Sequence, residues 1–389
     1  MFTNYNIAVH LDPIRQHLAA QVELSLKMPH TGRQLEFYLQ RDLRVASVVG
    51  KAARFSCHGK SFTFAPDSAT WQIELAEQAA VGETVKLCFE YSGTLSQPFP
   101  RGWDTNRLTP QWVELGMYGP WFPWNNQYGS FTYQVKVYIN QSYTVVGLGN
   151  TERQKDHWLL TSSQPVEDIV LTAAESFART GGDGGIYVFY TREQDAQGAR
   201  QLADDACWAL EHFSRWLGER RVKADLKVVM APRDKGGGYA RPGFVIMQGV
   251  DRKNFIHELA HLWWTGASVD SWEDWLNEAF AEYSAVRAMG ELEGQQAFER
   301  YLENKRAHTQ NLPPLRNLSR EHEKAWLVLY HKGALILHQL QQALGEEAFT
   351  RLLRRRLREK TDTTEGFVAL VRDVAGEEQT REFASWLDS

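Results

Sequence analysis

The change of hydrophobic pattern near residues 179–185 constrains the fold of this chain more than any other feature. Before it, apolar and polar residues alternate in "QVELSLKM" (21–28), "TVKLCFEY" (84–91) and "FTYQVKVYI" (131–139). Such alternation indicates strands that bury one face, in the manner of an antiparallel sheet. After the glycine-rich "RTGGDGG" (179–185), apolar residues recur at helical spacing, namely Leu202, Ala206, Ala209, Leu210, Phe213 and Leu217. The sequence therefore predicts a β domain followed by a helix-rich α+β domain.

The second half is predicted to be mainly helical, with two short strands near its start. Gly218 stands where a helix ending at residue 217 would have its C-terminal cap. The stretches "LKVVMAP" (226–232) and "FVIMQ" (244–248) predict the two strands. From about residue 251 onward the pattern is helical, interrupted by "NLPPL" (311–315). In "RLLRRRLREK" (351–360) the spacing predicts buried leucines and solvated arginines.

Length and composition are those of a soluble globular chain with more than one domain. At roughly 150 residues per domain, the 389 residues predict two or three domains. Hydrophobic residues make up 43% of the chain and charged residues 23%, the usual globular balance. The 14 tryptophans predict a large aromatic core or an aromatic-lined cleft. The net charge of −5 argues against nucleic acid as a partner, because general binding to nucleic acid uses a clustered basic surface.

Targeting features and cysteine usage predict a cytoplasmic protein. The opening "MFTNYNIAVHLDP" has no basic start followed by an apolar run, so no signal peptide is expected. No window reaches about 18 uninterrupted apolar residues, so no membrane span is expected. The three cysteines, Cys57, Cys88 and Cys207, are widely spaced without CxxC pairing, which favours reduced thiols.

The stretch "NFIHELAHLWW" (254–264) carries two histidines, His257 and His261, four residues apart. On a helix, residues at this spacing lie one turn apart on the same side, with about 5–6 Å between Cβ atoms. Two imidazoles can converge on one ion from there. A catalytic zinc site also needs a third protein ligand and one open position. An HExxH pair alone also occurs on ordinary polar helices, so the third ligand decides between these readings.

Glu278 is the candidate third ligand. It lies in "SWEDWLNEAFAEY" (271–283), where Ser271 is the predicted N-cap and apolar residues form one helical face. A carboxylate among apolar neighbours needs a cation, and an ion held by two neutral histidines is one. The set therefore predicts a single Zn2+ ion. Glu258 points about 100° away from His257 on the helix, so it can take a proton from the attacking water instead of binding the metal.

The sequence resembles the M1 family of zinc aminopeptidases, the gluzincin group that includes leukotriene A4 hydrolase. The resemblance is carried by "HELAHLWW" followed by "WLNEAFAEY", and it extends to "YNIAVHLDPIRQHLAAQVELSL", "LYHKGALILHQLQQALGEEAF" (329–349) and "EFASWLDS". It covers nearly the whole chain. It implies an α+β multidomain fold with an N-terminal antiparallel, saddle-like β domain at residues 1–183. A thermolysin-like, mostly helical zinc peptidase domain is implied at residues 184–389.

The same resemblance implies roles for individual residues. His257, His261 and Glu278 match the family's metal ligands, and Glu258 matches its general base. Tyr330 stands where the family has a tyrosine whose hydroxyl stabilises the tetrahedral oxyanion, a task that suits a phenol donor. The alternative for Tyr330 is a core tyrosine at the start of a helix.

The family's exopeptidase motif G-x-M-E-N, whose glutamate binds the free α-amine of the substrate, is not kept. In the corresponding stretch "GGGYARPGFVIMQ" (236–248), Ala240 and Arg241 stand where Glu and Asn are expected. A guanidinium cannot anchor an ammonium, so Arg241 either meets a carboxylate or faces solvent. The strand can still pair with an extended peptide, and its glycines would let that peptide approach closely. The substrate-binding candidates here are Gly237, Gly238, Tyr239, Ala240 and Arg241.

A substitute for the missing anchor is predicted in "QWVELGMYGPWFPW" (111–124), which resembles the family's Q-x-E segment in the β domain. Counting back from Phe122 and Pro123 aligns Glu114 with the family's glutamate, which also helps to bind the terminal amine. Glu114 would then be the sole carboxylate for that task. The alternative is a glutamate on a surface strand.

Spacing and length also depart from the family pattern. Sixteen residues, 262–277, separate His261 from Glu278, which is fewer than the family typically has. The connection "TGASVDS" is therefore expected to be short. The family's C-terminal helical domain, which usually covers the cleft, has no counterpart in this sequence. An open cleft, or one covered by a second subunit in a homo-oligomer, is expected.

Three functions remain open on the sequence. The first is a zinc metallopeptidase with a peptide substrate, acting as an aminopeptidase that removes N-terminal residues. The second is a zinc endopeptidase or a leader-peptide-processing peptidase with an altered amine anchor. The third is a peptide-binding module that has lost catalysis, against which the intact set of metal ligands and general base argues. The first is the favoured prediction.

Overall fold

The chain folds into two compact units in the computed structural model, which describes residues 3–59, 61–62, 65–95, 107–233 and 237–389. The β unit comprises Met1–Arg179, Phe189–Asp195 and Val229–Gly237, and the helical unit comprises Thr180–Val188, Ala196–Val228 and Gly238–Ser389. The first passage between the units, at Arg179 and Thr180, lies close to the predicted boundary after residue 183. The two short returns to the β unit were not predicted.

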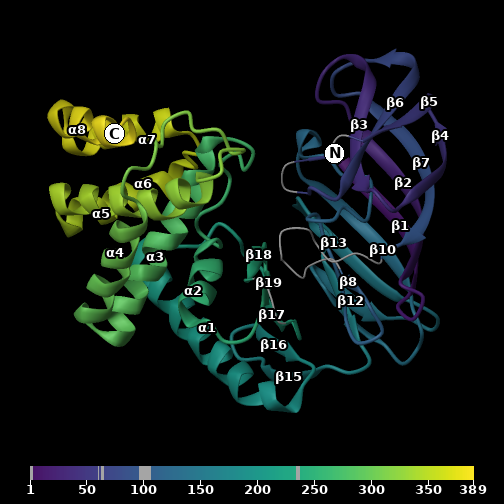
Figure 1. The fold of residues 1–389 in the computed structure, drawn as a ribbon, viewed down its shortest axis with the longest axis horizontal. Coiled ribbons are helices and arrows are strands. Elements are labelled where there is room, and N and C mark those ends of the chain that lie inside the picture. The colour runs from purple at the N-terminus through teal and green to yellow at the C-terminus, as the bar shows by residue number, and fades with distance from the viewer. Residues whose placement is uncertain (1–2, 60, 63–64, 96–106, 234–236) are drawn as a thin grey trace. The chain divides into compact units, whose positions relative to one another are not determined.

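The described residues of the β unit form three sheets of their own (Figure 1). Its strands are β1 (Thr3–Asp12), β2 (His17–Lys27), β3 (Gly32–Gln40), β4 (Arg44–Gly50), β5 (Ala52–His58), β6 (Ser68–Ala79), β7 (Thr84–Thr94), β8 (Arg107–Leu108), β9 (Val113–Leu115), β10 (Phe131–Tyr138), β11 (Thr144–Gly147), β12 (Asn150–Arg153), β13 (Trp158–Val166) and β14 (Leu171–Ala174). The largest sheet has the strand order β12-β13-β10-β1-β2-β7-β4. The other two sheets have the orders β11-β14-β9-β8 and β3-β6-β5.

The alternating stretches of the sequence are confirmed as strands β2, β7 and β10. Every second side chain of β2 is buried: Leu18, Ala20, Val22, Leu24 and Leu26. The strands β7 and β10 alternate in the same way, so one face of the sheet forms the core. One pairing departs from the antiparallel expectation, because β1 and β10 run parallel, with Ile7 opposite Val135. The hydrophobic pattern of a strand does not encode the direction of a partner far away in the sequence.

The helical unit holds most of the helices, with α3 in contact with α2, α4 and α5 (Figure 1). Its helices are α1 (Ala196–Leu217), α2 (Arg252–Ala260), α3 (Trp275–Glu293), α4 (Gln295–His308), α5 (Gly333–Leu344), α6 (Glu346–Glu359), α7 (Thr364–Ala375) and α8 (Glu377–Leu387). A sheet of order β15-β16-β17-β19-β18 completes the described strands: β15 (Ala178–Gly181), β16 (Ile186–Tyr190), β17 (Leu226–Met230), β18 (Tyr239–Arg241) and β19 (Phe244–Met247). Strand β18 is at the edge of this sheet.

The helical predictions hold for most of this half. Helix α1 ends at Leu217, and Gly218 follows with φ of +91° while its N–H donates to the Ser214 carbonyl at 3.0 Å. Strands β17 and β19 confirm the two short strands. The break between helices is longer than the predicted 311–315, because no helix forms between α4 and residue 325. Among the described residues, no helix combines the length and apolar character that a membrane crossing requires.

Helix α6 corrects the prediction for its arginines. Leu352, Leu353 and Leu357 are buried as expected, but Arg356 is buried as well. Its guanidinium lies 4.1 Å from the ring centroid of Phe280 and donates through Nε to the Thr361 carbonyl at 3.1 Å. A guanidinium is weakly hydrated and stacks on aromatic faces, which helical spacing alone does not reveal. Burial lowers the pKa of Arg356 to about 9.

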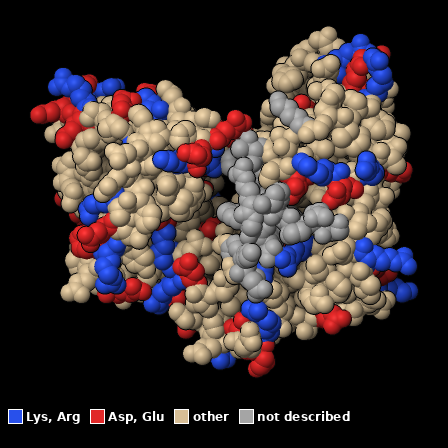
Figure 2. Space-filling model, viewed as in Figure 1, with Lys and Arg blue, Asp and Glu red and all other residues tan. Residues whose placement is uncertain are grey.

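Acidic and basic side chains are interspersed on the face drawn in Figure 2. Both signs occur over each unit, and neither forms one continuous area on that face. This mixed surface accords with the small net charge of −5.

Candidate metal centre

Helix α2 carries the two predicted histidine ligands. The Asp251 side chain caps its start by accepting from the Asn254 N–H at 3.0 Å. Its apolar residues Phe255, Ile256, Leu259 and Ala260 are fully buried and hold the helix in the core of the unit. His257 lies within the helix, and His261 is its C-terminal cap residue with α-helical φ and ψ, so both histidines face the same side.

Helix α3 carries the predicted third ligand. The Ser271 side chain accepts from the Glu273 N–H at 3.2 Å and caps a short 3-10 turn, Trp272–Asp274, which leads directly into α3. The predicted cap therefore begins a 3-10 turn instead of the α-helix itself. Glu278 lies in the first turn of α3, next to the buried Trp275 and Phe280.

The structure brings His257, His261 and Glu278 around one point. The Nε2 atom of His257 lies 3.2 Å from Nε2 of His261 and 3.2 Å from Oε2 of Glu278. The third side of this triangle, from Nε2 of His261 to Oε2 of Glu278, is 3.3 Å. Ligand atoms at about 2.0–2.1 Å from a tetrahedral zinc lie about 3.3–3.5 Å apart, so the triangle fits that ion. Three ligands leave a fourth position for water or substrate.

The charges of the three side chains also call for a cation. Burial raises the pKa of Glu278, but His261 and His257 lower it further, so that the pKa lies well below its usual value. Burial lowers the pKa of His261, but Glu278 outweighs this effect and raises the pKa to about 10. Without a metal, the carboxylate thus attracts protons to the imidazoles. A dication at the same point supplies that positive charge and leaves both histidines neutral, as metal binding requires.

The short connection between the two helices is held by Asn277. Its side-chain amide donates to the Ala267 carbonyl at 3.0 Å, and its carbonyl oxygen accepts from the Ala267 N–H at 3.2 Å. A further bond from the same amide reaches Asp274 at 2.9 Å. The residue directly before Glu278 therefore anchors the loop. The reduced spacing is accommodated in this loop while the two helices keep the ligand geometry.

Both imidazoles are oriented through their second nitrogen. Nδ1 of His257 lies 2.9 Å from Oε2 of Glu282, and Nδ1 of His261 lies 3.1 Å from the Trp264 carbonyl. A carboxylate and a carbonyl can only accept, so each Nδ1 carries a proton, and in the neutral form of each ring Nε2 presents a lone pair. This is the arrangement of metal-binding histidines, whose other nitrogen donates to an oxygen.

Glu282 was missed in the sequence, although it is central to the site. Its carboxylate accepts from His257, Lys253 and Lys305, which lie on α2 and α4. Burial raises the pKa of Glu282, but Lys253 and the other partners outweigh this and hold it well below its usual value. A signal was present: Glu282 follows Glu278 by four residues, and Lys253 precedes His257 by four, so each pair shares one helical face.

Glu258 is buried beside the three ligand residues but is not one of them. Burial raises the pKa of its carboxyl, and the neighbouring His257, His261 and Arg241 lower it in part. The net shift is upward. A raised pKa brings a carboxylate closer to the range in which it serves as a general base.

Tyr330 lies on an unusual turn next to the same centre. Residues Leu327–Lys332 form a π-helical turn, an element that often marks functional sites. The Tyr330 ring stacks on the His257 ring, with centroids 5.8 Å apart and planes 9° from parallel. Gly333 follows the turn, and a Cβ there would come within 2.6 Å of the Ala279 Cβ. Close approach at Gly333 thus packs the turn against α3, one residue after Glu278.

The candidate amine-anchor stretch forms the edge strand β18 and the glycines before it. Tyr239 is buried and pairs opposite Ile246, while Ala240 and Arg241 are half-buried. The Arg241 guanidinium lies 5.1 Å from the Tyr239 ring centroid, and its Nη1 donates to the Ala240 carbonyl at 2.8 Å. Its positive charge acts on Glu258, so Arg241 belongs to the surroundings of the centre.

The glycines of this stretch differ in how tightly they are surrounded. Gly237 is exposed, whereas a Cβ at Gly238 would come within 2.5 Å of the Met247 sulfur. Gly236 of the quoted stretch lies outside the described residues. Gly238 therefore lets the chain pass close to β19 immediately before β18.

Glu114 is a buried residue of the β unit, on strand β9, with no exposed surface. Its Oε2 accepts from the Trp112 indole at 3.0 Å and lies 3.5 Å from Nε of the buried Arg233. The alternative of an exposed surface-strand glutamate is therefore wrong. An ammonium ligand would have to share this carboxylate with Arg233.

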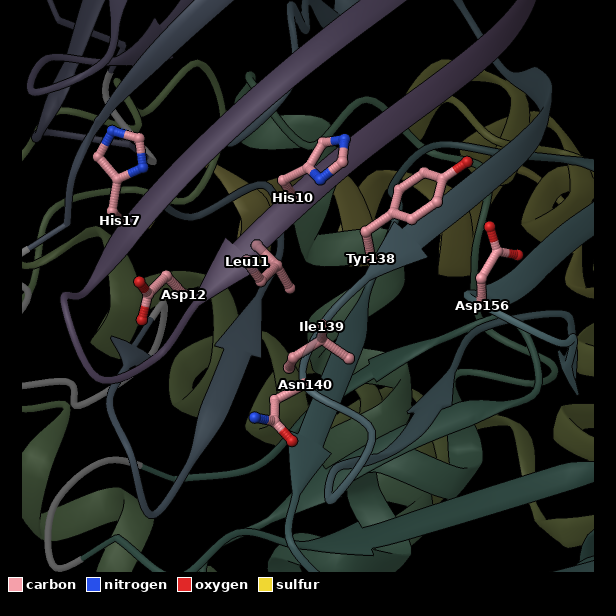
Figure 3. Close-up of a pocket in the computed structure, with 8 residues that line it drawn as sticks. All are labelled: His10, Leu11, Asp12, His17, Tyr138, Ile139, Asn140 and Asp156. Carbon is pink, nitrogen blue, oxygen red and sulfur yellow. The ribbon is translucent and has the colours of Figure 1, made fainter.

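A shallow pocket on the β unit lies where β1 and β10 end (Figure 3). Its volume is about 270 Å³, and it is lined by His10, Leu11, Asp12, His17, Tyr138, Ile139, Asn140 and Asp156. The His10 and Tyr138 rings stack there at 4.5 Å. None of the predicted site residues lines this pocket.

Comparisons with known proteins bear on both halves of the chain. Residues 252–383 match the peptidase family M1 domain. No curated protein sequence matches the chain.

Three similar solved structures share the fold. The M1 zinc metallopeptidase of Deinococcus radiodurans, as a mutant bound to Tyr-Ser-Ala substrate, is 21% identical with a TM-score of 0.73, and the match covers 100% of this chain and 93% of that chain. A two-domain M1 zinc metallopeptidase mutant bound to L-tryptophan is 20% identical with a TM-score of 0.74, and the match covers 99% of this chain and 94% of that chain. Native leukotriene A4 hydrolase from Saccharomyces cerevisiae is 16% identical with a TM-score of 0.75, and the match covers 99% of this chain and 67% of that chain.

The domain match contains all three side chains of the metal centre, together with Glu258 and Tyr330. The structural matches extend over the β unit as well, as the sequence resemblance implied. The chain is thus a peptidase that carries a family M1 domain at residues 252–383, within the two-domain fold of the M1 zinc metallopeptidases.

Proposed function

We propose that this peptidase is an aminopeptidase that releases N-terminal residues from peptides with one zinc ion held by His257, His261 and Glu278. The triangle of ligand atoms, with sides of 3.2 to 3.3 Å, is the observation that carries the metal assignment. The Deinococcus structure that is bound to Tyr-Ser-Ala supports a short peptide as substrate. The structure of the two-domain enzyme that is bound to L-tryptophan supports a single amino acid as product.

The protein groups around the ion have separate tasks. His257, His261 and Glu278 would hold the zinc ion, which would supply a Lewis acid for the scissile carbonyl and lower the pKa of the attacking water. Glu258 takes the proton of that water and later returns it to the leaving amine. The Tyr330 hydroxyl donates a hydrogen bond to the developing oxyanion, from a ring that is stacked on His257.

The edge strand β18 offers its backbone to the peptide. An extended substrate can add to this edge through main-chain hydrogen bonds, which suit any sequence. Gly237 and Gly238 remove side chains from the approach to the strand, and Tyr239, Ala240 and Arg241 form the strand itself. These five residues are the proposed substrate-binding stretch.

Replacing Tyr330 by phenylalanine is expected to lower kcat by about 10²–10³, as for the loss of one oxyanion donor. The ring and its stacking on His257 remain, so zinc affinity and KM should change little. Steady-state kinetics of the zinc-loaded variant measure this split. A loss in zinc content equal to the loss in kcat would assign Tyr330 a structural task instead.

Glu114 is the proposed carboxylate for the substrate amine. Glu114→Gln is expected to raise KM for peptides with a free N-terminus by about tenfold or more, because a charge-assisted hydrogen bond is lost.

N-acetylated peptides of the same sequence should be poor substrates of the parent enzyme. A parent enzyme that cleaves acetylated and free peptides equally well would rule out the aminopeptidase assignment.

A zinc endopeptidase, including a leader-peptide-processing enzyme, is the second candidate function. Arg241 favours it, because a guanidinium stands on β18 where the family's amine-binding motif is expected. The pairing of Glu114 with Arg233 favours it as well, since this carboxylate is already engaged. Cleavage of N-acetylated peptides at internal bonds is the result that distinguishes it.

A further inference from the structure

We propose that Glu282, together with Lys253 and Lys305, is a positioning group that sets the orientation of the metal ligand His257. These three residues are called the Glu282 cluster: the Glu282 carboxylate accepts from both lysines and from Nδ1 of His257. The inference rests on the proposed metal centre, and it adds residues behind that centre which are neither its metal ligands nor its general base.

The Glu282 cluster joins three helices behind one ligand. Glu282 comes from α3, Lys253 from α2 and Lys305 from α4. The Glu282 and Lys305 side chains are buried, with 3% and 5% of their surface exposed, while Lys253 keeps 22%. One oxygen of Glu282, Oε2, accepts from His257 and Lys253, and the other, Oε1, accepts from Lys305 and Lys253. Both oxygens are therefore fixed from two sides.

Stability alone is a poor explanation for such a cluster. Taking two ammonium groups and a carboxylate out of water is costly, and apolar residues of similar size often stabilise a core as well or better. A buried charged network can instead hold a neighbouring side chain in one orientation. The geometry defined here is that of His257, whose Nδ1 lies 2.9 Å from the carboxylate.

The His257 ring is held on its edge and on its face. Glu282 accepts at the ring edge and so selects the tautomer in which Nε2 points into the ligand triangle. Tyr330 stacks on the ring face at 9° from parallel. Two lysines keep the carboxylate an acceptor and prevent it from turning toward the metal. A change at Glu282 would thus move a metal ligand and its stacked neighbour together.

A charge-balanced double variant tests this inference without leaving a deeply buried lysine unpaired. Glu282→Gln with Lys305→Met removes one negative and one positive charge, and Lys253 can turn to solvent through its exposed portion. The variant is compared with Lys305→Met alone, in which the carboxylate keeps its bonds to His257 and Lys253. Glu346→Gln is the matched control, since Glu346 forms an ion pair with Arg287 on the same helix α3.

Zinc affinity is measured by competition with a chelator, and the unfolding temperature of each zinc-free protein is measured alongside. The double variant is expected to bind zinc about 10–100-fold more weakly, as for other residues that orient a metal-binding histidine. Lys305→Met is expected to lose less than tenfold, and Glu346→Gln is expected to bind like the parent.

The outcomes separate this inference from the proposed function. Parent-like zinc affinity in the double variant would overturn the positioning role of Glu282. A loss of affinity that follows zinc-free stability equally in all variants, the Glu346→Gln control included, would overturn it as well. A parent enzyme that binds no zinc would instead refute the metal centre of the proposed function.

Discussion

Replacing Glu258 by glutamine is expected to leave zinc bound and to reduce kcat by at least 10²–10⁴, the usual contribution of a general base. The amide has nearly the shape of the carboxylate but cannot accept a proton from water. Since Glu258 is buried and is not among the three convergent ligand side chains, the metal should bind as in the parent enzyme. Zinc content and single-turnover hydrolysis of a peptide are the two measurements.

An exposed glutamate provides the control for this change. Glu303 on α4 is exposed, so Glu303→Gln alters the same chemical group far from any ligand-binding role and should keep parent activity. Full turnover by the Glu258→Gln enzyme would remove Glu258 from the mechanism. Loss of zinc in that variant would show that Glu258 supports the metal instead of the proton transfer.

The parts of the fold that the sequence predicted are those whose evidence is local. Alternation in residues 21–28 predicted β2 because every second side chain of that strand packs into one core. The helix ending at Leu217 was predicted because its apolar face repeats and Gly218 adopts a positive φ at its end. His257 and His261 converge because four residues make about one helical turn, whatever the rest of the chain does.

The parts that could not be predicted depend on partners distant in the sequence. The parallel pairing of β1 with β10 joins strands on opposite sides of several hairpins, and neither strand's pattern encodes that direction. Lys305 looks like an ordinary surface residue of an amphipathic helix, because lysine is almost never fully buried unless it is paired. Only the approach of α4 to α3 brings it to Glu282.

The candidate substrate-binding residues illustrate a third situation. The resemblance aligned Glu114 with an amine-binding glutamate, yet the carboxylate is fully buried with Trp112 and Arg233. Arg233 lies more than a hundred residues away in the chain, so no local pattern could reveal this pairing. Motif positions predict which side chain is present, whereas its partners decide what that side chain is free to bind.

Glu278→Gln is expected to weaken zinc binding, whereas Glu258→Gln is expected to leave zinc binding unchanged. Here the same isosteric change removes the negative charge of the one carboxylate among the three ligand side chains, and leaves a neutral amide in its place. Zinc affinity should fall by more than the roughly 10–100-fold seen when an orienting residue is lost. Turnover should then fall with zinc occupancy and recover in part when zinc is added in excess.

Thermal unfolding with and without zinc measures this loss directly. A ligand present at 100 times its Kd stabilises the folded state by about 2.7 kcal/mol, so zinc should raise the Tm of the parent and of Glu258→Gln alike. In Glu278→Gln the same zinc concentration should raise Tm little or not at all. The two glutamates lie on neighbouring helices around one centre, and both are changed by the same replacement of oxygen with NH2. If zinc raised the Tm of both variants equally, Glu278 would not be a ligand, because only a difference in metal binding separates the two roles.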